Sequence, residues 1–85
     1  MQQSEAKLHL TVYYRQGCHL CDEMTALLAE FQEELNFGFV LVDIDADPVL
    51  RQRFNADIPV VALADRILFR HFFDEAILRQ ALQHG

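Results

Sequence analysis

The order of three apolar patterns in the first half of the chain restricts the possible folds most. Residues 8–14 alternate between the two faces of an extended strand. Apolar residues then recur at three- and four-residue spacings over residues 20–35, which is typical of an amphipathic helix, and this helix is expected to end near Asn36. Residues 37–44 are nearly continuously apolar, as in a strand covered on both faces. Together the three patterns predict a parallel βαβ unit.

The next segment predicts a short helix followed by two strands. Asp47 followed by Pro48 is typical of a helix start, because the carboxylate can cap the first turn and the proline ring suits its backbone angles. Asn55 is expected to end this helix. Strand-forming residues over 60–64 and 67–70 flank a polar turn, which predicts a β-hairpin.

The tail of the chain predicts a last helix, and with it the fold class. Asp74 is expected to cap this helix, whose apolar face is formed by Ile77, Leu78, Ala81 and Leu82. The order β-α-β-α-β-β-α belongs to the α/β class, and it predicts a four-stranded mixed sheet with helices on both faces. Because 85 residues leave too little apolar area for two separately folding halves, we expect one domain over residues 1–85.

Charge and apolar runs exclude several function classes. The formal net charge is −6 and only seven Lys and Arg are spread along the chain, so no basic surface for nucleic acid is expected. Residues 1–7 have neither the basic start nor the apolar stretch of a signal peptide, and no apolar run approaches the ~20 residues of a membrane helix. We therefore expect a cytoplasmic protein that does not bind membranes.

The residues with the most chemical potential are the two cysteines of the sequence Cys18-His19-Leu20-Cys21, where the first strand leads into the first helix. A thiol near a helix N-terminus faces unpaired backbone N–H groups, which stabilise its thiolate and lower the pKa from ~8.5 toward the ~3.5–7.5 range. Cys18 is therefore the expected nucleophile. Cys21 lies one turn further on the same side and is the expected resolving thiol.

Two other interpretations of the cysteine pair are open. Both cysteines could be small buried apolar residues without chemical function. They could also supply half of a tetrahedral zinc site, although the chain has no second cysteine pair and the other candidate ligands His9, His71 and His84 show no ligand spacing. A disulfide closing so short a loop would stabilise the fold only weakly, so a purely structural role is disfavoured.

These motifs resemble the glutaredoxins and, more loosely, the thioredoxins. The resemblance covers nearly the whole chain: a first strand ending in Tyr-Tyr, Arg15 three residues before the cysteine pair, Asp43-Ile44-Asp45 at the end of the second strand, and Ile58-Pro59 before the hairpin. Within these families the chain is most similar to small bacterial glutaredoxin-like proteins of unassigned function. The resemblance implies a thioredoxin-like fold.

The resemblance also implies further site residues. It places Pro59 in a cis peptide bond beside the thiols, and Ile58 then offers its backbone to a bound chain as an extra strand. Arg15 is expected to bind a substrate carboxylate and to favour the Cys18 thiolate. The alternatives are an ordinary proline at the start of a strand for Pro59 and a solvated turn residue for Arg15.

Two features depart from the glutaredoxin pattern. Leu68-Phe69-Arg70-His71-Phe72 stands where glutaredoxins have a Gly-Gly pair whose backbone meets glutathione, so glutathione is possible but is not the expected preferred partner. His19-Leu20 replaces the usual Pro-Tyr between the cysteines. His19 could tune the thiols or could simply face solvent.

Two residue clusters near the motif have alternative interpretations. Asp43 and Asp45 could be taken for paired acids or metal ligands, but turn or cap roles are expected for them. Phe69, Phe72 and Phe73 could form an apolar landing patch beside the thiols, but we expect them to be buried under the last helix.

The sequence thus predicts a thiol-disulfide oxidoreductase in which Cys18 and Cys21 are catalytic and Arg15, Ile58 and Pro59 bind substrate. The expected partners are a disulfide-containing protein or a small thiol, with a reductase or glutathione as electron donor; the protein is expected to be a monomer with no permanently bound cofactor and no metal. The alternative is a non-catalytic binding module or a thiol-based carrier of metal or clusters.

Overall fold

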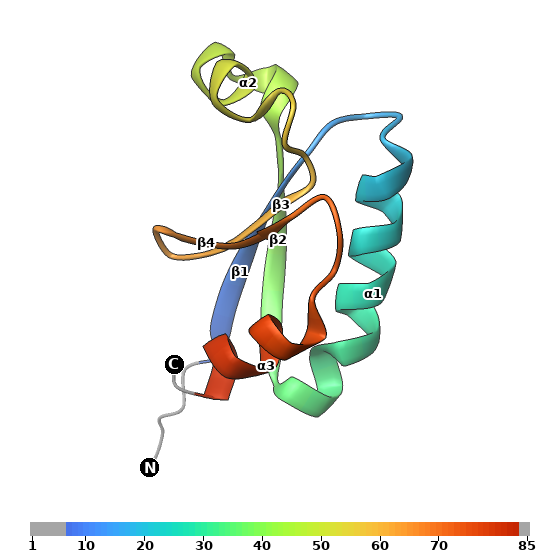
Figure 1. The fold of residues 1–85 in the computed structure, drawn as a ribbon, viewed down its shortest axis with the longest axis vertical. Helices are drawn as coiled ribbons and strands as arrows, with labels where there is room; N and C mark the ends of the chain where they lie inside the picture. Colours follow the sequence, from blue (N-terminus) through green and yellow to red (C-terminus); the bar gives the residue numbers. More distant parts are fainter. Residues whose placement is uncertain (1–6, 84–85) are drawn as a thin grey trace.

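The computed structural model describes residues 7–83 and contains four strands and three α-helices (Figure 1). In chain order the elements are β1 (Leu8–Tyr14), α1 (His19–Leu35), β2 (Phe37–Asp43), the 3₁₀ helix η1 (Ile44–Ala46), α2 (Pro48–Phe54), β3 (Val60–Leu63), β4 (Arg66–Arg70) and α3 (Glu75–Gln83). The order of strands and α-helices is the one that the sequence predicts.

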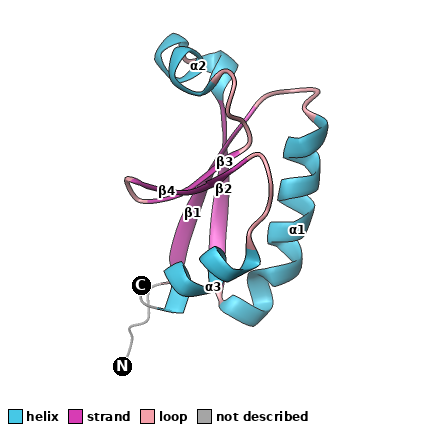
Figure 2. Ribbon diagram, viewed as in Figure 1, coloured by secondary structure: helices cyan, strands magenta, loops and turns pink. Residues whose placement is uncertain are grey.

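The strands, magenta in Figure 2, form one mixed sheet, and their pairing order is β2-β1-β3-β4. β1 and β2 are parallel, with Leu8 opposite Phe37 and Tyr14 opposite Asp43. β3 runs antiparallel to both β1 and β4, and the β3–β4 hairpin contains an irregularity between Val61 and Ala62. The predicted four-stranded mixed sheet is therefore confirmed.

Side chains on the two faces of the sheet build two cores. The larger core lies between the sheet, α1 and α3, and its buried members are Leu10, Val12, Met24, Leu28, Phe37, Val61, Phe69 and Leu78. The smaller core lies on the other face, where Phe54 of α2 packs with Ile44 and Val60. Helices thus contribute to cores on both faces, as predicted, and α2 and α3 lie at opposite ends of the molecule (Figure 1).

Polar caps set the helix ends that the sequence predicts. Asn36 ends α1 in the left-handed conformation, with φ 54°. The carboxylate of Asp47 accepts a hydrogen bond of 2.9 Å from the N–H of Val49, and that of Asp74 accepts one of 3.0 Å from the N–H of Ile77. These local hydrogen bonds explain why the boundaries could be recognised from residue type alone.

The expectation that the second strand is covered on both faces is wrong. β2 lies at the edge of the sheet, where Val40 is 51% and Leu41 is 46% exposed. Since consecutive residues of a strand point to opposite faces, neither face of β2 is fully covered. A continuous apolar run predicts a buried strand, but whether the strand lies at the centre or at the edge of the sheet depends on which strands it pairs with. Ile77 on the expected buried face of α3 is also partly exposed.

The helices of the described chain include no candidate membrane span. Within residues 7–83 no helix has both the length and the apolar character required to cross a bilayer.

The larger core predicts where truncation destabilises the fold. Leu28 of α1 is fully buried in this core, so Leu28→Ala is expected to lower the free energy of unfolding by about 2–5 kcal/mol through lost burial and a residual cavity. Val49→Ala is the control, because Val49 is 71% exposed on α2 and its truncation should change stability by less than about 0.5 kcal/mol. Urea titrations of both variants measure the difference, and equal effects would contradict this assignment of the core.

Candidate functional site

Three segments that are distant in sequence meet at one end of the sheet. Tyr14 ends β1 opposite Asp43, so the turn that leads to Cys18 and the segment that leads into η1 leave the sheet at the same end. β3 runs the other way and pairs Val60 with Tyr13, so Pro59 enters the sheet at this end too. Gly17 allows the turn before Cys18, since its φ of +76° suits a residue without Cβ.

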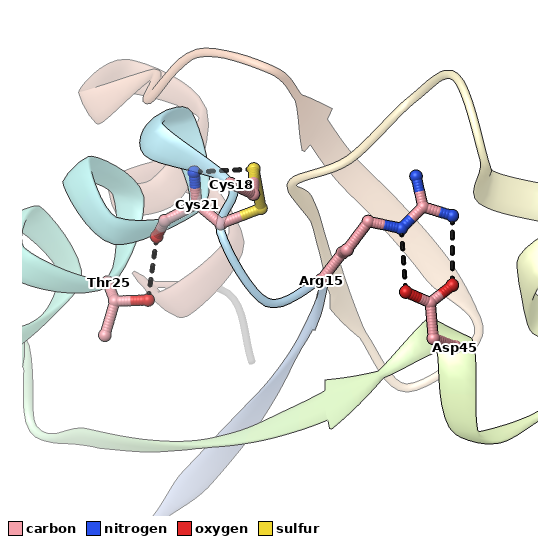
Figure 3. Close-up of a disulfide and its surroundings, with 5 residues drawn as sticks. All are labelled: Arg15, Cys18, Cys21, Thr25 and Asp45. Carbon is pink, nitrogen blue, oxygen red and sulfur yellow. Dashed lines mark hydrogen bonds and ion pairs between the residues drawn. A yellow bond between two sulfur atoms is a disulfide. The ribbon is translucent and has the colours of Figure 1, made fainter.

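The two cysteines form a disulfide at the start of α1 (Figure 3). Their Cα atoms are 5.1 Å apart, which suits a bridge across one helical turn. Cys18 is the N-cap of α1 in an extended conformation, and its Sγ accepts a 3.1 Å hydrogen bond from the backbone N–H of Cys21. The outer sulfur therefore occupies the position where an N-cap side chain normally receives an orphan N–H.

The two sulfurs have different environments. Cys18 is half-buried, whereas Cys21 is only 1% exposed and lies in α1 next to the buried Met24 region of the core. One turn below, the hydroxyl of Thr25 donates a 2.9 Å hydrogen bond to the carbonyl of Cys21. An approaching molecule can therefore reach the sulfur of Cys18 more easily than that of Cys21.

The Arg15 side chain points away from the disulfide and is held by other residues (Figure 3). Its guanidinium makes two parallel contacts to Asp45, Nε to Oδ2 at 2.9 Å and Nη2 to Oδ1 at 3.0 Å, and Nη2 also donates to Asn55 Oδ1 at 2.6 Å. The hydrogen bond from Arg15 lowers the pKa of Asp45 and correspondingly raises that of Arg15. Sequence reasoning missed this contact, because Arg15 and Asp45 come together only through the β1–β2 pairing.

Asp43, the last residue of β2, has the cap role that the sequence predicts, whereas the Asp45 side chain is an ion-pair partner. Asp43 accepts a 2.9 Å hydrogen bond from the N–H of Asp45, which starts η1, and Asp45 binds Arg15. Among residues 7–83 no group of three or more His, Cys, Asp or Glu lies close enough to hold a metal ion. The candidate ligand His84 lies outside the described residues, and His9 lies over Gly38 of β2, whose missing Cβ leaves room for the ring.

His19 faces solvent beside Cys18. Its side chain is 88% exposed, and Nε2 lies 3.1 Å from a carboxylate oxygen of Glu23 one turn further along α1. The solvent-facing alternative for His19 therefore describes its position in the structure.

The Ile58–Pro59 peptide bond is cis, as the resemblance to glutaredoxins implies. Pro59 is buried, and its carbonyl accepts a 2.8 Å hydrogen bond from the N–H of His71. This bond joins the segment before β3 to the segment after β4. Ile58 packs its side chain on the smaller core, and the predicted pairing of its backbone with a substrate stays a prediction.

The phenylalanine cluster divides between core and surface. Phe69 is buried, and Phe73 packs on Phe31 of α1 with ring centroids 5.2 Å apart. Phe72 is 69% exposed, so the expectation of burial is wrong for this residue. Phe72 directly follows His71, whose φ is 64°, in the connection between β4 and α3, and such connecting segments run over the surface.

Phe72 lines a surface groove that also includes Leu20, the residue that precedes Cys21 in the sequence. The groove has a volume of 250 Å³ and is lined by Leu20, Met24 and Leu27 of α1 and by His71, Phe72 and Phe73, with Glu23 beside them. We call it the Leu20–Phe72 groove. Sequence reasoning noted the phenylalanines but not Leu20, because only the packing of the segment after β4 against α1 joins the two.

Comparison with protein families and curated proteins finds a glutaredoxin-like family and uncharacterised bacterial relatives. The model of the glutaredoxin-like domain (DUF836) matches residues 9–83. Uncharacterised proteins of Mycobacterium tuberculosis and Mycobacterium bovis are 37% identical over 57 residues, which is 61% of this chain. The matched segment spans 59% of the length of these curated relatives.

Solved structures extend the similarity over most of the chain. A protein of Nitrosomonas europaea known from solution NMR is 32% identical, with a TM-score of 0.83 over 95% of this chain and 98% of that one. A Xanthomonas campestris protein known from X-ray diffraction is 33% identical, with a TM-score of 0.65 over 89% of this chain and 97% of that one. Thioredoxin 1 of Thermosipho africanus, at 13% identity and a TM-score of 0.63 over 91% of this chain and 92% of that one, shares the fold alone.

The Arg15–Asp45 pair predicts a pH-dependent contribution to stability. The folded-state pKa of Asp45 lies below its ordinary value of 3.8, so the pair stabilises the fold fully above that value and the contribution is lost as pH falls through the folded pKa. Asp45→Asn should therefore be less stable than the parent protein at pH 7, and the difference should shrink below pH 3.8.

Urea titrations across this pH range measure the difference. In the Arg15→Gln background the same Asp45→Asn change should lose most of this pH dependence, because the hydrogen bond from Arg15 is the largest cause of the lowered pKa and the charge of Arg51 is a smaller one. A pH-dependent difference that persists undiminished without Arg15 would show that another group dominates the pKa of Asp45.

Proposed function

The chain belongs to the family of glutaredoxin-like domains, and we propose that it is a thiol-disulfide oxidoreductase that works through Cys18 and Cys21. One observation carries the proposal: the half-buried sulfur of Cys18 caps α1 and receives the N–H of Cys21, while the sulfur of Cys21 is buried behind it. This asymmetry suits one sulfur to attack an incoming disulfide and the other to resolve the product.

The exchange proceeds in two balanced steps from the reduced protein. The Cys18 thiolate attacks one sulfur of the substrate disulfide, forms a mixed disulfide and releases the other substrate sulfur as a thiolate. The Cys21 thiolate then attacks Sγ of Cys18, and the second substrate sulfur leaves. Two electrons pass from the protein dithiol to the substrate, and the Cys18–Cys21 disulfide is formed. A dithiol, or two thiols such as glutathione, reduces the protein again by the reverse steps.

The N-cap position explains why Cys18 is the attacking sulfur. A negative charge there interacts with the unpaired N–H groups and the positive end of the α1 dipole. The hydrogen bond already present between the Cys21 N–H and Cys18 Sγ becomes charge-assisted when the sulfur is a thiolate. The leaving-group ability of Cys18 rises for the same reason, which helps its release when the disulfide is reduced.

The neighbouring segments would orient the substrate. The backbone at Ile58, before the cis Pro59, is at the sheet end that carries Cys18, and a substrate chain could pair with it as an added strand. Arg15 acts as a positioning residue in this proposal, because its contacts with Asp45 and Asn55 tie the turn before Cys18 to η1 and to the end of α2.

Equilibration in mixtures of reduced and oxidised glutathione tests the proposal. Alkylation of thiols followed by mass spectrometry should show Cys18 and Cys21 passing together from two alkylated thiols to one disulfide, reversibly in both directions. Thiols that stay fully alkylated in every mixture would overturn the oxidoreductase assignment and favour a binding module. Stoichiometric metal in the purified protein would favour a metal carrier instead.

Single-cysteine variants separate the two roles. Cys21→Ser should still react with a disulfide but stop at the mixed disulfide on Cys18, which mass spectrometry detects as an adduct of one substrate half. Cys18→Ser should form no adduct under the same conditions, because the remaining thiol is buried. Adducts that accumulate faster on Cys18→Ser than on Cys21→Ser would reverse the assignment of nucleophile and resolving thiol.

A further inference from the structure

We propose that the preferred substrates are protein disulfides flanked by an apolar and a basic residue, and that the site disfavours anionic small disulfides such as oxidised glutathione. This inference rests on the proposed exchange function and concerns the substrate of the same site. Its two supports are the shape of the Leu20–Phe72 groove and the distribution of charge around Cys18.

The groove can hold an apolar side chain against Leu20, which lies within the first turn of α1 together with the cysteine pair. Leu20 lies between the two cysteines in the sequence, and Phe72 on the facing segment is 69% exposed. A volume of 250 Å³ accommodates one large side chain rather than an extended ligand. A residue close to the substrate cysteine could therefore fill the groove while the substrate sulfur meets Cys18.

The charge near the groove favours a cation. Glu23 lies at the groove, whereas the residues that line the groove include neither Lys nor Arg. His19 contacts Glu23 only from a solvent-exposed position and leaves that carboxylate more than half exposed. A Lys or Arg that flanks the substrate disulfide would meet the Glu23 carboxylate, while a substrate carboxylate would be repelled.

The two arginines that could neutralise a substrate carboxylate are already paired. The guanidinium of Arg15 donates two hydrogen bonds to the carboxylate of Asp45 and one to the side-chain oxygen of Asn55. Arg70, which directly precedes the groove residue His71, lies with Nε 3.7 Å from Asp57. An anionic disulfide that bound through either arginine would compete with these internal carboxylates, so such binding is disfavoured.

Small disulfides of different charge test the electrostatic part. The reduced protein is mixed with cystamine, bis(2-hydroxyethyl) disulfide or oxidised glutathione, and rates of Cys18–Cys21 oxidation are followed by quenching and mass spectrometry. Each rate constant is divided by that of dithiothreitol with the same disulfide, which removes differences in intrinsic reactivity. The normalised rates should fall in the order cystamine, hydroxyethyl disulfide, glutathione disulfide, and the spread should narrow at high salt.

Charge variants locate the effect. Glu23→Gln should reduce the ratio of the cystamine rate to the glutathione rate by roughly 2–5-fold, the size expected for a surface charge contact. Glu33→Gln is the matched control, because it removes the same charge from an exposed position of α1 about 15 Å further along the helix. Equal effects of both variants would show that the net charge of the protein, and not Glu23 at the groove, causes the preference, and would overturn the role of the groove.

Peptide disulfides test the apolar part. Two peptides are compared, one with Phe and one with Ser on one side of the disulfide, and both carry Arg on the other side. The first should react with a kcat/KM roughly 10-fold higher, and Phe72→Ala should remove most of this preference. Val49→Ala, which truncates an exposed apolar residue on α2, should keep it.

The outcomes separate this inference from the proposed function. If the reduced protein reacts with none of the disulfides, the oxidoreductase assignment itself fails. If it reacts with all of them but prefers glutathione disulfide, or shows no preference between the peptides, the exchange function stands and the substrate class proposed here is wrong.

Discussion

The parallel pairing of β1 with β2 is the constraint on which the rest of the structure depends. Two parallel neighbouring strands require a crossover connection, which α1 supplies. The helix therefore begins just beyond the C-terminal end of β1. This puts Cys18 at the N-cap of α1, where unpaired N–H groups meet its sulfur. The same pairing sets Tyr14 opposite Asp43, and thereby brings η1 and Asp45 within reach of Arg15.

Polar contacts around the cysteine pair stabilise its surroundings without contacting the sulfurs. Arg15 is committed to Asp45 and Asn55, and the carbonyl of Pro59 holds the segment after β4 through His71. Each contact joins segments that are far apart in the sequence, so the turn, the cis-proline segment and the Leu20–Phe72 groove are held in one arrangement. A site built from several anchored segments can present a defined surface to a substrate beside a single reactive sulfur.

Sequence patterns predicted most of the fold because its determinants are local. Strand alternation, helical spacing and caps such as Asp47 and Asp74 act within a few residues, and the structure contains the elements that they predict. Burial was less predictable. The apolar character of Val40 and Phe72 predicted buried positions, but the first lies in an edge strand and the second in the surface connection between β4 and α3.

The sequence by itself determined the order of elements, the helix ends and the presence of a cysteine pair at a helix start, since each depends on residue type and spacing along one segment. Only the tertiary structure decided that Arg15 turns to Asp45 instead of the disulfide, that β2 is an edge strand, and that Leu20 and Phe72 share a groove. These features depend on which distant segments meet in the folded chain. Strand pairing and side-chain packing determine those contacts, and local sequence patterns do not predict them.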